Sequence, residues 1–137
     1  MDRFVKRLGV VLLLAGAVLG CGKGRPHVPV TGTLKFTDGS VPKGFECAIT
    51  FQPAAGGPGT KGASSTIGDD GAFSLRTVTP GDGALPGEYK VTVHVLDSYQ
   101  DGKSLVAEKF TKASTTPLQA TVTAGGKNHF DFVVEKP

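Results

Sequence analysis

The chain has 137 residues, and this length predicts one ordinary domain rather than several. It contains 20 Gly, 9 Pro and 8 Phe but no Trp, and its aliphatic and aromatic residues recur in short clusters, which excludes an intrinsically disordered chain. The formal net charge is +3, but residues 1–20 hold three of the 15 Lys and Arg residues and one of the 12 acidic residues, so the remainder carries only +1. Charges so evenly balanced leave no basic patch and argue against nucleic acid as a partner.

Residues 1–20, MDRFVKRLGVVLLLAGAVLG, have the form of an export signal. A short basic head precedes an uncharged apolar run from Leu8 to Leu19, with small residues near its end. Twelve helical residues rise only about 18 Å, well short of the roughly 30 Å hydrocarbon core of a bilayer, so a permanent transmembrane helix is disfavoured. We therefore expect a helical signal peptide that is cleaved between Gly20 and Cys21.

The three residues before Cys21, Val18-Leu19-Gly20, resemble the lipobox of bacterial lipoproteins. That resemblance implies a thioether between the Cys21 sulfur and diacylglycerol, with Cys21 as the first residue of the mature protein. Each buried methylene contributes about 0.8 kcal/mol, so two or three acyl chains would hold the protein firmly to a membrane. Two alternatives stay open: an ordinary secretory signal in which Cys21 is incidental, or a disulfide between Cys21 and Cys47.

Residues 21–29 form the expected flexible tether, because the stretch GKGRPHVP after Cys21 has no periodicity and two prolines. Gly22 is not the aspartate that signals inner-membrane retention in enteric-type lipoproteins. The expected location is therefore the bacterial cell envelope, at the outer membrane or facing the periplasm, with attachment through the lipid.

From residue 28 onward the apolar residues recur with a period of two, which is typical of strands with one buried face. The runs that alternate in this way are residues 28–36, 45–51, 72–77, 88–95, 118–123 and 129–134. The inward face of the second run is predicted to carry Phe45, Cys47, Ile49 and Phe51. Some seven short strands separated by turns predict an all-β domain over residues 30–136, a seven-stranded antiparallel β-sandwich.

Glycine-rich turns separate the runs: TDGS, DDGA, TPGDGALPG and AGGK. Asp-Gly and Gly-Gly supply the positive φ angles that tight hairpins need, and they predict a hairpin over residues 66–75, TIGDDGAFSL. Residues 53–64 are expected to form an exposed loop. The stretch LVAEKF, residues 105–110, is predicted to form at most one helical turn.

Four segments of the chain carry a resemblance to a known family. In order they are VTGTLKFTDGSVPKGFECAITFQP, DDGAFSL, PGEYKVTV and VAEKFTKASTTPLQATVTAGGKNHFDF. In this order they resemble the bacterial carboxypeptidase-regulatory-like, or transthyretin-like, lipoprotein domains. The resemblance covers nearly the whole chain. It implies a seven-stranded, prealbumin-like sandwich and export from the cytoplasm. It implies little about activity, because the shared motifs are structural and a fold alone does not set a function.

The pattern of polar residues gives no sign of a catalytic or metal site. His27 lies in the tether, while His94 and His129 fall on the polar faces of separate runs, so we expect no metal ligand among them. Asp69, Asp70 and Asp82 are interpreted as turn residues because a calcium loop needs a regular series of oxygen ligands. We expect neither an enzyme nor a cofactor.

Cys47 and the pair formed by Lys35 and Asn128 each allow a chemical interpretation and a simpler one. Cys47 is predicted to be a small buried hydrophobic residue rather than a reactive thiol, because it alternates with Phe45 and Ile49. Lys35 lies in the first predicted strand and Asn128 at the start of the last one, as in modules with buried isopeptide bonds. Alternation puts Lys35 on the outer face and Asn128 on the inner face, so the two should not meet.

The leading hypothesis is a membrane-anchored, non-enzymatic sandwich with a structural or protein-interaction role in the envelope. Partner contacts are expected at the loops of one end, residues 53–64 and 79–87. One alternative is a module that binds a polysaccharide or a small ligand, for which Tyr99 is the candidate because it is the only tyrosine outside the core pattern. Another is a small transthyretin-like hydrolase that would use His94 or His129, although this chain ends in VVEKP rather than the Tyr-Arg-Gly-Ser of the hydroxyisourate hydrolases.

Overall fold

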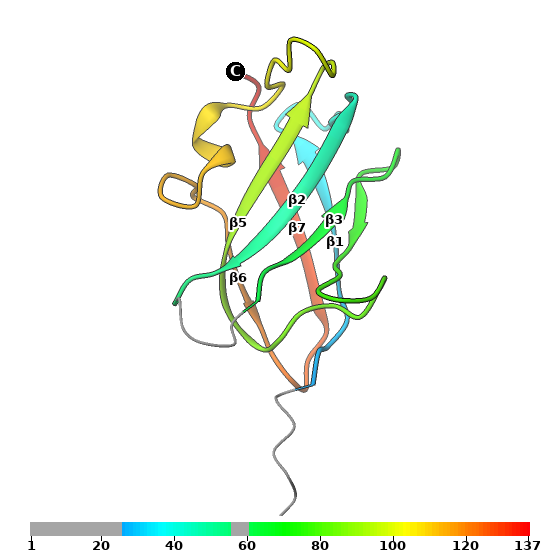
Figure 1. The fold of residues 1–137 in the computed structure, drawn as a ribbon, viewed down its shortest axis with the longest axis vertical. Helices are drawn as coiled ribbons and strands as arrows, with labels where there is room; N and C mark the ends of the chain where they lie inside the picture. The colour runs from blue at the N-terminus through cyan, green and yellow to red at the C-terminus, as the bar shows by residue number, and fades with distance from the viewer. Residues whose placement is uncertain (1–25, 56–60) are drawn as a thin grey trace, which may run out of the picture.

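The computed structural model describes residues 26–55 and 61–137. The predictions for the signal peptide, the cleavage between Gly20 and Cys21, and the lipid on Cys21 fall outside the described residues. The described part of the chain forms seven β-strands and one short 3₁₀ helix, η1 (Figure 1). Their bounds are β1 Val30–Phe36, β2 Glu46–Pro53, β3 Ala63–Thr66, β4 Ala72–Ser74, β5 Gly87–Leu96, η1 Glu108–Thr111, β6 Gln119–Val122 and β7 Asn128–Val134.

The strands form two sheets, with the order β4-β1-β7 in one and β3-β2-β5-β6 in the other. Figure 1 shows β2 and β5 in front of β1 and β7, so the sheets are two layers with the core between them. The predicted all-β, two-layered class with seven strands is therefore confirmed for the described residues.

The prediction of a wholly antiparallel sandwich was wrong for one pair of strands. β1 and β7 run parallel, in a register from Val30 opposite Asn128 to Phe36 opposite Val134. Parallel neighbours need a long crossover connection, and here the whole domain between the first and last strands provides it. Alternation reports which face of a strand is buried but not the direction of its neighbour.

An aromatic cluster fills the middle of the core. The ring of Phe51 lies 5.8–6.2 Å from four other rings, those of Phe73, Tyr89, Phe130 and Phe132. Gly32 on β1 faces this cluster, and a Cβ at that position would come within 2.4 Å of the Phe73 ring and 2.0 Å of the Phe130 carbonyl oxygen. Glycine at position 32 thus leaves the space that the Phe73 ring occupies.

The predicted hairpin over residues 66–75 contains the expected turn, but its two strands belong to different sheets. The Gly68 amide donates to the Ala72 carbonyl (2.9 Å), and Gly71 has a φ of 83°. β3 then pairs with β2 while β4 pairs with β1. The two arms are joined by the isolated bridge between Ser64 and Arg76 and by a hydrogen bond from the Ser74 amide to the Ser65 hydroxyl (3.2 Å). This turn therefore closes one side of the sandwich instead of extending a sheet.

The segment 104–118 closes the opposite side. Its start pairs with the end of β5, where the Leu105 amide donates to the Val95 carbonyl (2.8 Å), and the Ala107 amide reaches the Glu135 carbonyl just after β7 (2.9 Å). The single helical turn expected over 105–110 forms three residues later as η1, and the buried Phe110 packs against the core. Among the described residues no helix is long and apolar enough to cross a membrane.

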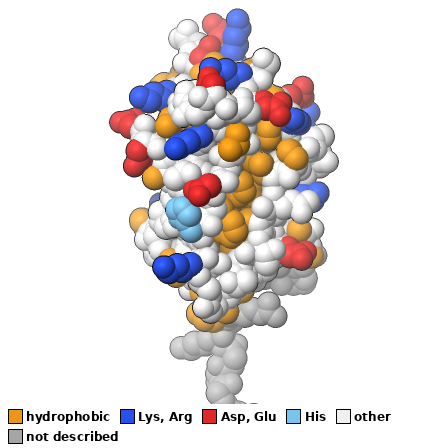
Figure 2. Space-filling model, turned by 180° about the vertical axis from the view of Figure 1, so that it is seen from behind, with side chains coloured by type: hydrophobic (Ala, Val, Ile, Leu, Met, Phe, Trp, Pro, Cys, Tyr) orange, Lys and Arg blue, Asp and Glu red, His pale blue; other side chains and the backbone are white. Residues whose placement is uncertain are grey.

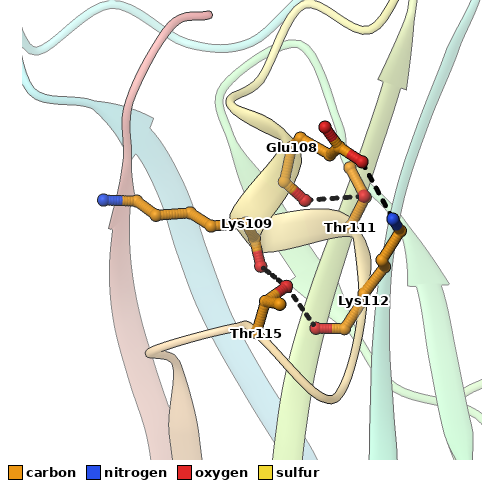
Figure 3. A network of polar contacts seen from close by, with 5 residues as sticks. All are labelled: Glu108, Lys109, Thr111, Lys112 and Thr115. Carbon is orange, nitrogen blue, oxygen red and sulfur yellow. Dashed lines mark hydrogen bonds and ion pairs between the residues drawn. The ribbon is translucent and has the colours of Figure 1, made fainter.

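Polar contacts hold η1 in a compact turn (Figure 3). The Lys112 Nζ atom lies 2.8 Å from Glu108 Oε1, and the Thr111 hydroxyl donates to the Glu108 carbonyl at 2.7 Å. The Thr115 hydroxyl donates to the Lys109 carbonyl at 2.9 Å, while the Lys109 side chain extends toward β7 and pairs with Glu135 at 3.1 Å. The segment is therefore fastened both to itself and to the neighbouring sheet.

The strand directions give the sandwich two distinct ends. At the tether end, residues 26–29 join the domain, and Val28 forms a bridge with Ala84 close to where β2 ends and β5 begins. At the distal end, β1 and β5 end and β2 begins, so this end carries the connections 37–45, 67–71 and 97–103. The ten residues of β5 separate the two ends by about 30 Å.

Candidate binding surface at the distal end

Phe45 lies in solvent, contrary to the prediction that it faces the core. Burial decreases steadily along this face of β2: Ile49 is fully buried, Cys47 is half-buried, and the Phe45 side chain is 65% exposed. The reason is that the opposite layer stops at this level, so the residue that continues the alternation has nothing to pack against. The Phe45 amide still donates to the Leu96 carbonyl at 2.7 Å, which fixes its backbone to the end of β5.

Tyr99 also lies in solvent and contacts Phe45. Its side chain is 84% exposed, and the two ring centroids are 5.8 Å apart with an interplanar angle of 65°. This edge-to-face arrangement is a favoured geometry for aromatic pairs. Two segments that are 54 positions apart in the sequence thus place two exposed rings side by side.

Hydrogen bonds within the connection 97–103 organise the backbone that carries Tyr99. The Asp97 amide donates to the Lys103 carbonyl (3.1 Å), and the Lys103 amide donates to the Asp97 carboxylate (3.0 Å). The Asp101 amide points at the Ser98 hydroxyl (3.4 Å). The tyrosine is therefore displayed on a turn that is closed by its own backbone.

A groove of about 330 Å³ lies beside Phe45, between residues 42–48 and residues 66–69. Gly44, one of the lining residues, packs closely against the end of β5, because a Cβ there would lie 2.3 Å from the Leu96 carbonyl oxygen. The groove has both apolar and polar lining, and its charged side chains are Lys43, Glu46 and Asp69. The sequence did not predict this groove, because its two walls come from segments far apart in the chain. One wall is the connection before β2 with the start of β2, and the other is the end of β3 with the turn that follows it.

Cys47 lines the groove but is chemically quiet. It is half-buried, and its Sγ atom lies 3.7 Å from the Pro42 carbonyl oxygen. Burial raises the pKa of the Cys47 thiol, so the thiolate, which is the reactive form, is disfavoured near neutral pH. The side chain packs against the core as predicted, although it is less buried than a core residue.

A polar network lies on the outer face of β1 and β7. The parallel register sets Thr31 beside His129 and Thr33 beside Asp131. The Thr31 Oγ1 atom is 3.1 Å from His129 Nδ1, His129 Nε2 is 3.0 Å from Asp131 Oδ1, and the Thr33 hydroxyl donates to the same carboxylate oxygen at 2.6 Å. The hydrogen bond from Thr33, followed by His129, lowers the pKa of Asp131.

The hydroxyl of Thr31, the imidazole of His129 and the carboxylate of Asp131 follow one another as a nucleophile, a base and an acid do in a catalytic triad. Their exposure to solvent, however, does not favour catalysis. The His129 and Asp131 side chains are 52% and 67% exposed, so water screens their charges. In Figure 2, which views this face of the molecule, a histidine and an acidic side chain lie on the open surface beside a strip of hydrophobic side chains. His94 is exposed on the other sheet, opposite Ala48, and cannot join this network.

Two of the three acidic turn residues, Asp70 and Asp82, accept hydrogen bonds from backbone amides of their own turns, as predicted. The Asp82 carboxylate accepts the amides of Thr77, Val78 and Thr79 at 2.7–3.0 Å, and these bonds, that of Thr79 foremost, lower the pKa of Asp82 to about 2. Asp70 likewise accepts the Ala72 amide at 3.0 Å. In the described part of the chain no three His, Cys, Asp or Glu side chains come close enough to hold a metal ion.

Lys35 and Asn128 do not meet, as alternation predicted. Lys35 lies opposite Val133 in the register, whereas Asn128 lies opposite Val30 at the other end of the strands. The buried Asn128 amide instead accepts from the Thr123 amide and donates to the Thr123 carbonyl, both at 2.9 Å. Asn128 therefore fastens the turn between β6 and β7.

Comparison with the models of known families, with curated proteins and with solved structures found no match to this chain. The resemblance to transthyretin-like lipoprotein domains thus stays a prediction from the sequence motifs. The exposed pair Phe45 and Tyr99, with the groove beside it, is the candidate site that the geometry itself defines.

Proposed function

We propose that this protein is a lipid-anchored lipoprotein of the bacterial cell envelope whose β-sandwich acts without catalysis, in a structural or interaction role. Two features support the proposal. The lipobox-like residues before Cys21 supply the anchor, and the exposed aromatic pair supplies a surface for a partner. The observation that carries it is the position of this pair at the end of the sandwich opposite the tether.

An anchor at one end and exposed rings at the other suit an envelope protein that presents a surface away from its membrane. The chain joins the sandwich at Val28, and β5 spans about 30 Å from that end to the connection that carries Tyr99. A lipid on Cys21 would therefore keep the tether end near the membrane and leave the distal end free.

The loops from which partner contacts were expected, 53–64 and 79–87, begin and return at the tether end. They do share one end of the sandwich, since Pro53 lies opposite Tyr89. In the proposed orientation the described ends of these loops lie nearest the membrane. We therefore assign the principal contact surface to the distal end instead.

The anchor is tested by growing cells with labelled palmitate. The wild type and Cys47→Ala should both incorporate the label, whereas Cys21→Ala should lose it and partition into the aqueous phase of a detergent extraction. Cys47→Ala is the matched control because Cys47 is the only other cysteine in the chain. An unlabelled wild-type protein would show that the anchor is wrong.

The contact surface is tested by site-specific photo-crosslinking in intact cells. A benzophenone amino acid at position 99 reports on the distal end, and the same group at position 78 reports on the tether end, where Val78 is 56% exposed. The proposal predicts a crosslinked envelope component from position 99 and none from position 78. The reverse result would return the contact to the loops at the tether end.

The second candidate function is a ligand-binding module, and the contact between Phe45 and Tyr99 favours it. Large aromatic side chains are usually buried in the protein interior. Two exposed aromatic rings that contact each other beside a groove therefore indicate a binding surface. The chemistry of that groove narrows the class of ligand.

A further inference from the structure

We propose that the distal groove binds a neutral glycan chain, with the rings of Phe45 and Tyr99 as its stacking surface. This inference rests on the proposed function, because it names the ligand class of the surface that the envelope protein would present.

The aromatic pair supplies the apolar half of a glycan site. A pyranose ring has C–H faces that pack on an aromatic face and hydroxyl groups that need polar partners at its edges. The two rings are 65% and 84% exposed, and their planes are inclined at 65°, so each offers a face to a ligand. From the sequence only Tyr99 was a candidate for a glycan surface, because Phe45 was expected in the core.

The groove supplies the polar half. Lys43 offers ammonium donors, while the carboxylates of Glu46 and Asp69 offer acceptors, and Thr66 carries a hydroxyl that can do either. Charges of both signs along one groove favour a neutral ligand, because an anion or a cation would each meet a like charge there. A neutral sugar can use every one of these groups.

The site is organised before any ligand binds. The Phe45 amide is tied to the Leu96 carbonyl at 2.7 Å, and the turn that carries Tyr99 is closed by the bonds between Asp97 and Lys103. Rigid aromatic side chains on a fixed backbone lose little conformational entropy when they bind. A low entropy cost is important for glycan binding, because glycan hydroxyls are already well solvated by water and gain little free energy when they bind the protein.

The extent of the apolar surface favours a glycan over a protein partner. A stable protein interface buries about 800 Å² on each side around a hydrophobic centre. Within the described residues the exposed large hydrophobic side chains are Phe45, Tyr99, Val78 and Val133. Only Phe45 and Tyr99 contact each other, because Val133, near the end of β7, lies on the outer face of the other sheet. Two rings and a groove match a few sugar units better than the centre of an interface.

The test uses the fact that the chain has only two tyrosines. Tyr89 is buried, with its hydroxyl donating to the Leu85 carbonyl (2.7 Å), so fluorotyrosine labelling should give one buried and one exposed ¹⁹F signal. The full chain in detergent micelles is titrated with cellohexaose and, separately, with chitohexaose. We expect at least one hexaose to shift the Tyr99 signal, and not the Tyr89 signal, with a millimolar or tighter dissociation constant.

Variants separate stacking from other contacts, with the dissociation constant measured by calorimetry. Phe45→Ala and Tyr99→Ala should each raise the constant by about tenfold, since each removes one stacking ring, while Tyr99→Phe keeps the ring and should stay within about threefold of the wild type. Val133→Ala, which alters an exposed hydrophobic residue on β7, should leave the dissociation constant unchanged.

Failure of the two hexaoses to shift the Tyr99 signal would overturn the glycan assignment, as would equal weakening by Val133→Ala. A protein crosslinked through position 99 together with silent hexaoses would assign the same surface to a protein partner. Loss of palmitate labelling, by contrast, would overturn the envelope anchor and leave a measured hexaose affinity intact, so the two proposals fail in distinguishable ways.

Discussion

The hydroxyl of Thr92 is buried on the outer face of β5 without a hydrogen-bond partner. The residue has no exposed surface, and its neighbours Val91 and Val93 point to the core side. A buried hydroxyl that loses its water without gaining a partner lowers the stability of a fold. The other buried threonine, Thr116, shows the opposite case, because its hydroxyl donates to the Val91 carbonyl at 2.6 Å.

Thr92→Val should therefore raise the free energy of unfolding by about 1 kcal/mol, since the substitution keeps the shape and removes the unpaired hydroxyl. Thr116→Val should lower it by about 1–2 kcal/mol, because it leaves the Val91 carbonyl without its donor. Urea titrations of both variants measure the difference. A loss of stability in both would mean that the Thr92 hydroxyl is satisfied in solution.

Asp82 makes the stability of the connection before β5 depend on pH. Its pKa of about 2 in the folded protein lies below the ordinary value of 3.8, so the folded state favours the charged carboxylate. The contribution is complete above pH 4 and is lost as the pH falls through 2. Melting temperatures measured from pH 5 to pH 2 should fall more steeply for the wild type than for Asp82→Asn, whereas Asp101→Asn should follow the wild type.

At the scale of elements, alternation predicted which residues of the strands face inward and failed where the second layer ends. Val30, Leu34, Ile49 and Val93 are all fully or almost fully buried, as the period of two requires. Phe45 continues the same period but lies beyond the opposite sheet. The length of one layer depends on strands that are distant in the sequence, so no local pattern could report it.

The candidate site also has one part that the sequence could predict and one part that it could not. Tyr99 could be identified from the sequence because it follows a completed strand pattern and belongs to none. The groove could not, because residues 42–48 and 66–69 meet only through the pairing of β2 with β3. A glycine directly before an aromatic strand start, as at Gly44, is the local signal that could have indicated a close backbone contact there.

The segment 104–118 is part of the core rather than a surface loop, and Phe110 tests this. The ring is 2% exposed and seals the side between β5 and β7. Phe110→Ala should lower the free energy of unfolding by about 3 kcal/mol, because it leaves a cavity at this side of the sandwich. Lys112→Ala removes only an exposed ion pair with Glu108, so it should leave the free energy of unfolding unchanged within the error of the measurement. Similar effects in chemical denaturation would show that η1 is a detachable loop.

At the scale of the whole molecule, the proposed anchor and the two ends of the sandwich predict an orientation. Fluorophores attached through Val78→Cys or Tyr99→Cys, each in a Cys47→Ala background, should differ in their distance from a lipid bilayer. Nitroxide lipids in the headgroup region should quench the probe at position 78 and spare the probe at position 99, since about 30 Å of sandwich separates the two ends. Equal quenching would mean that the domain lies on its side.

The parallel pairing of β1 with β7 also has a consequence for how the chain becomes a folded protein. β1 shares seven residue pairs with β7 and only three with β4, so the three-stranded sheet lacks most of its ladder until Asn128–Val134 have been synthesised. Contacts between such distant parts of a chain form late and slowly. A nascent polypeptide therefore cannot close its first sheet before residues 128–134 have left the ribosome. If the protein is exported as proposed, this delay would keep the chain unfolded, which is the state that a narrow translocation pore requires.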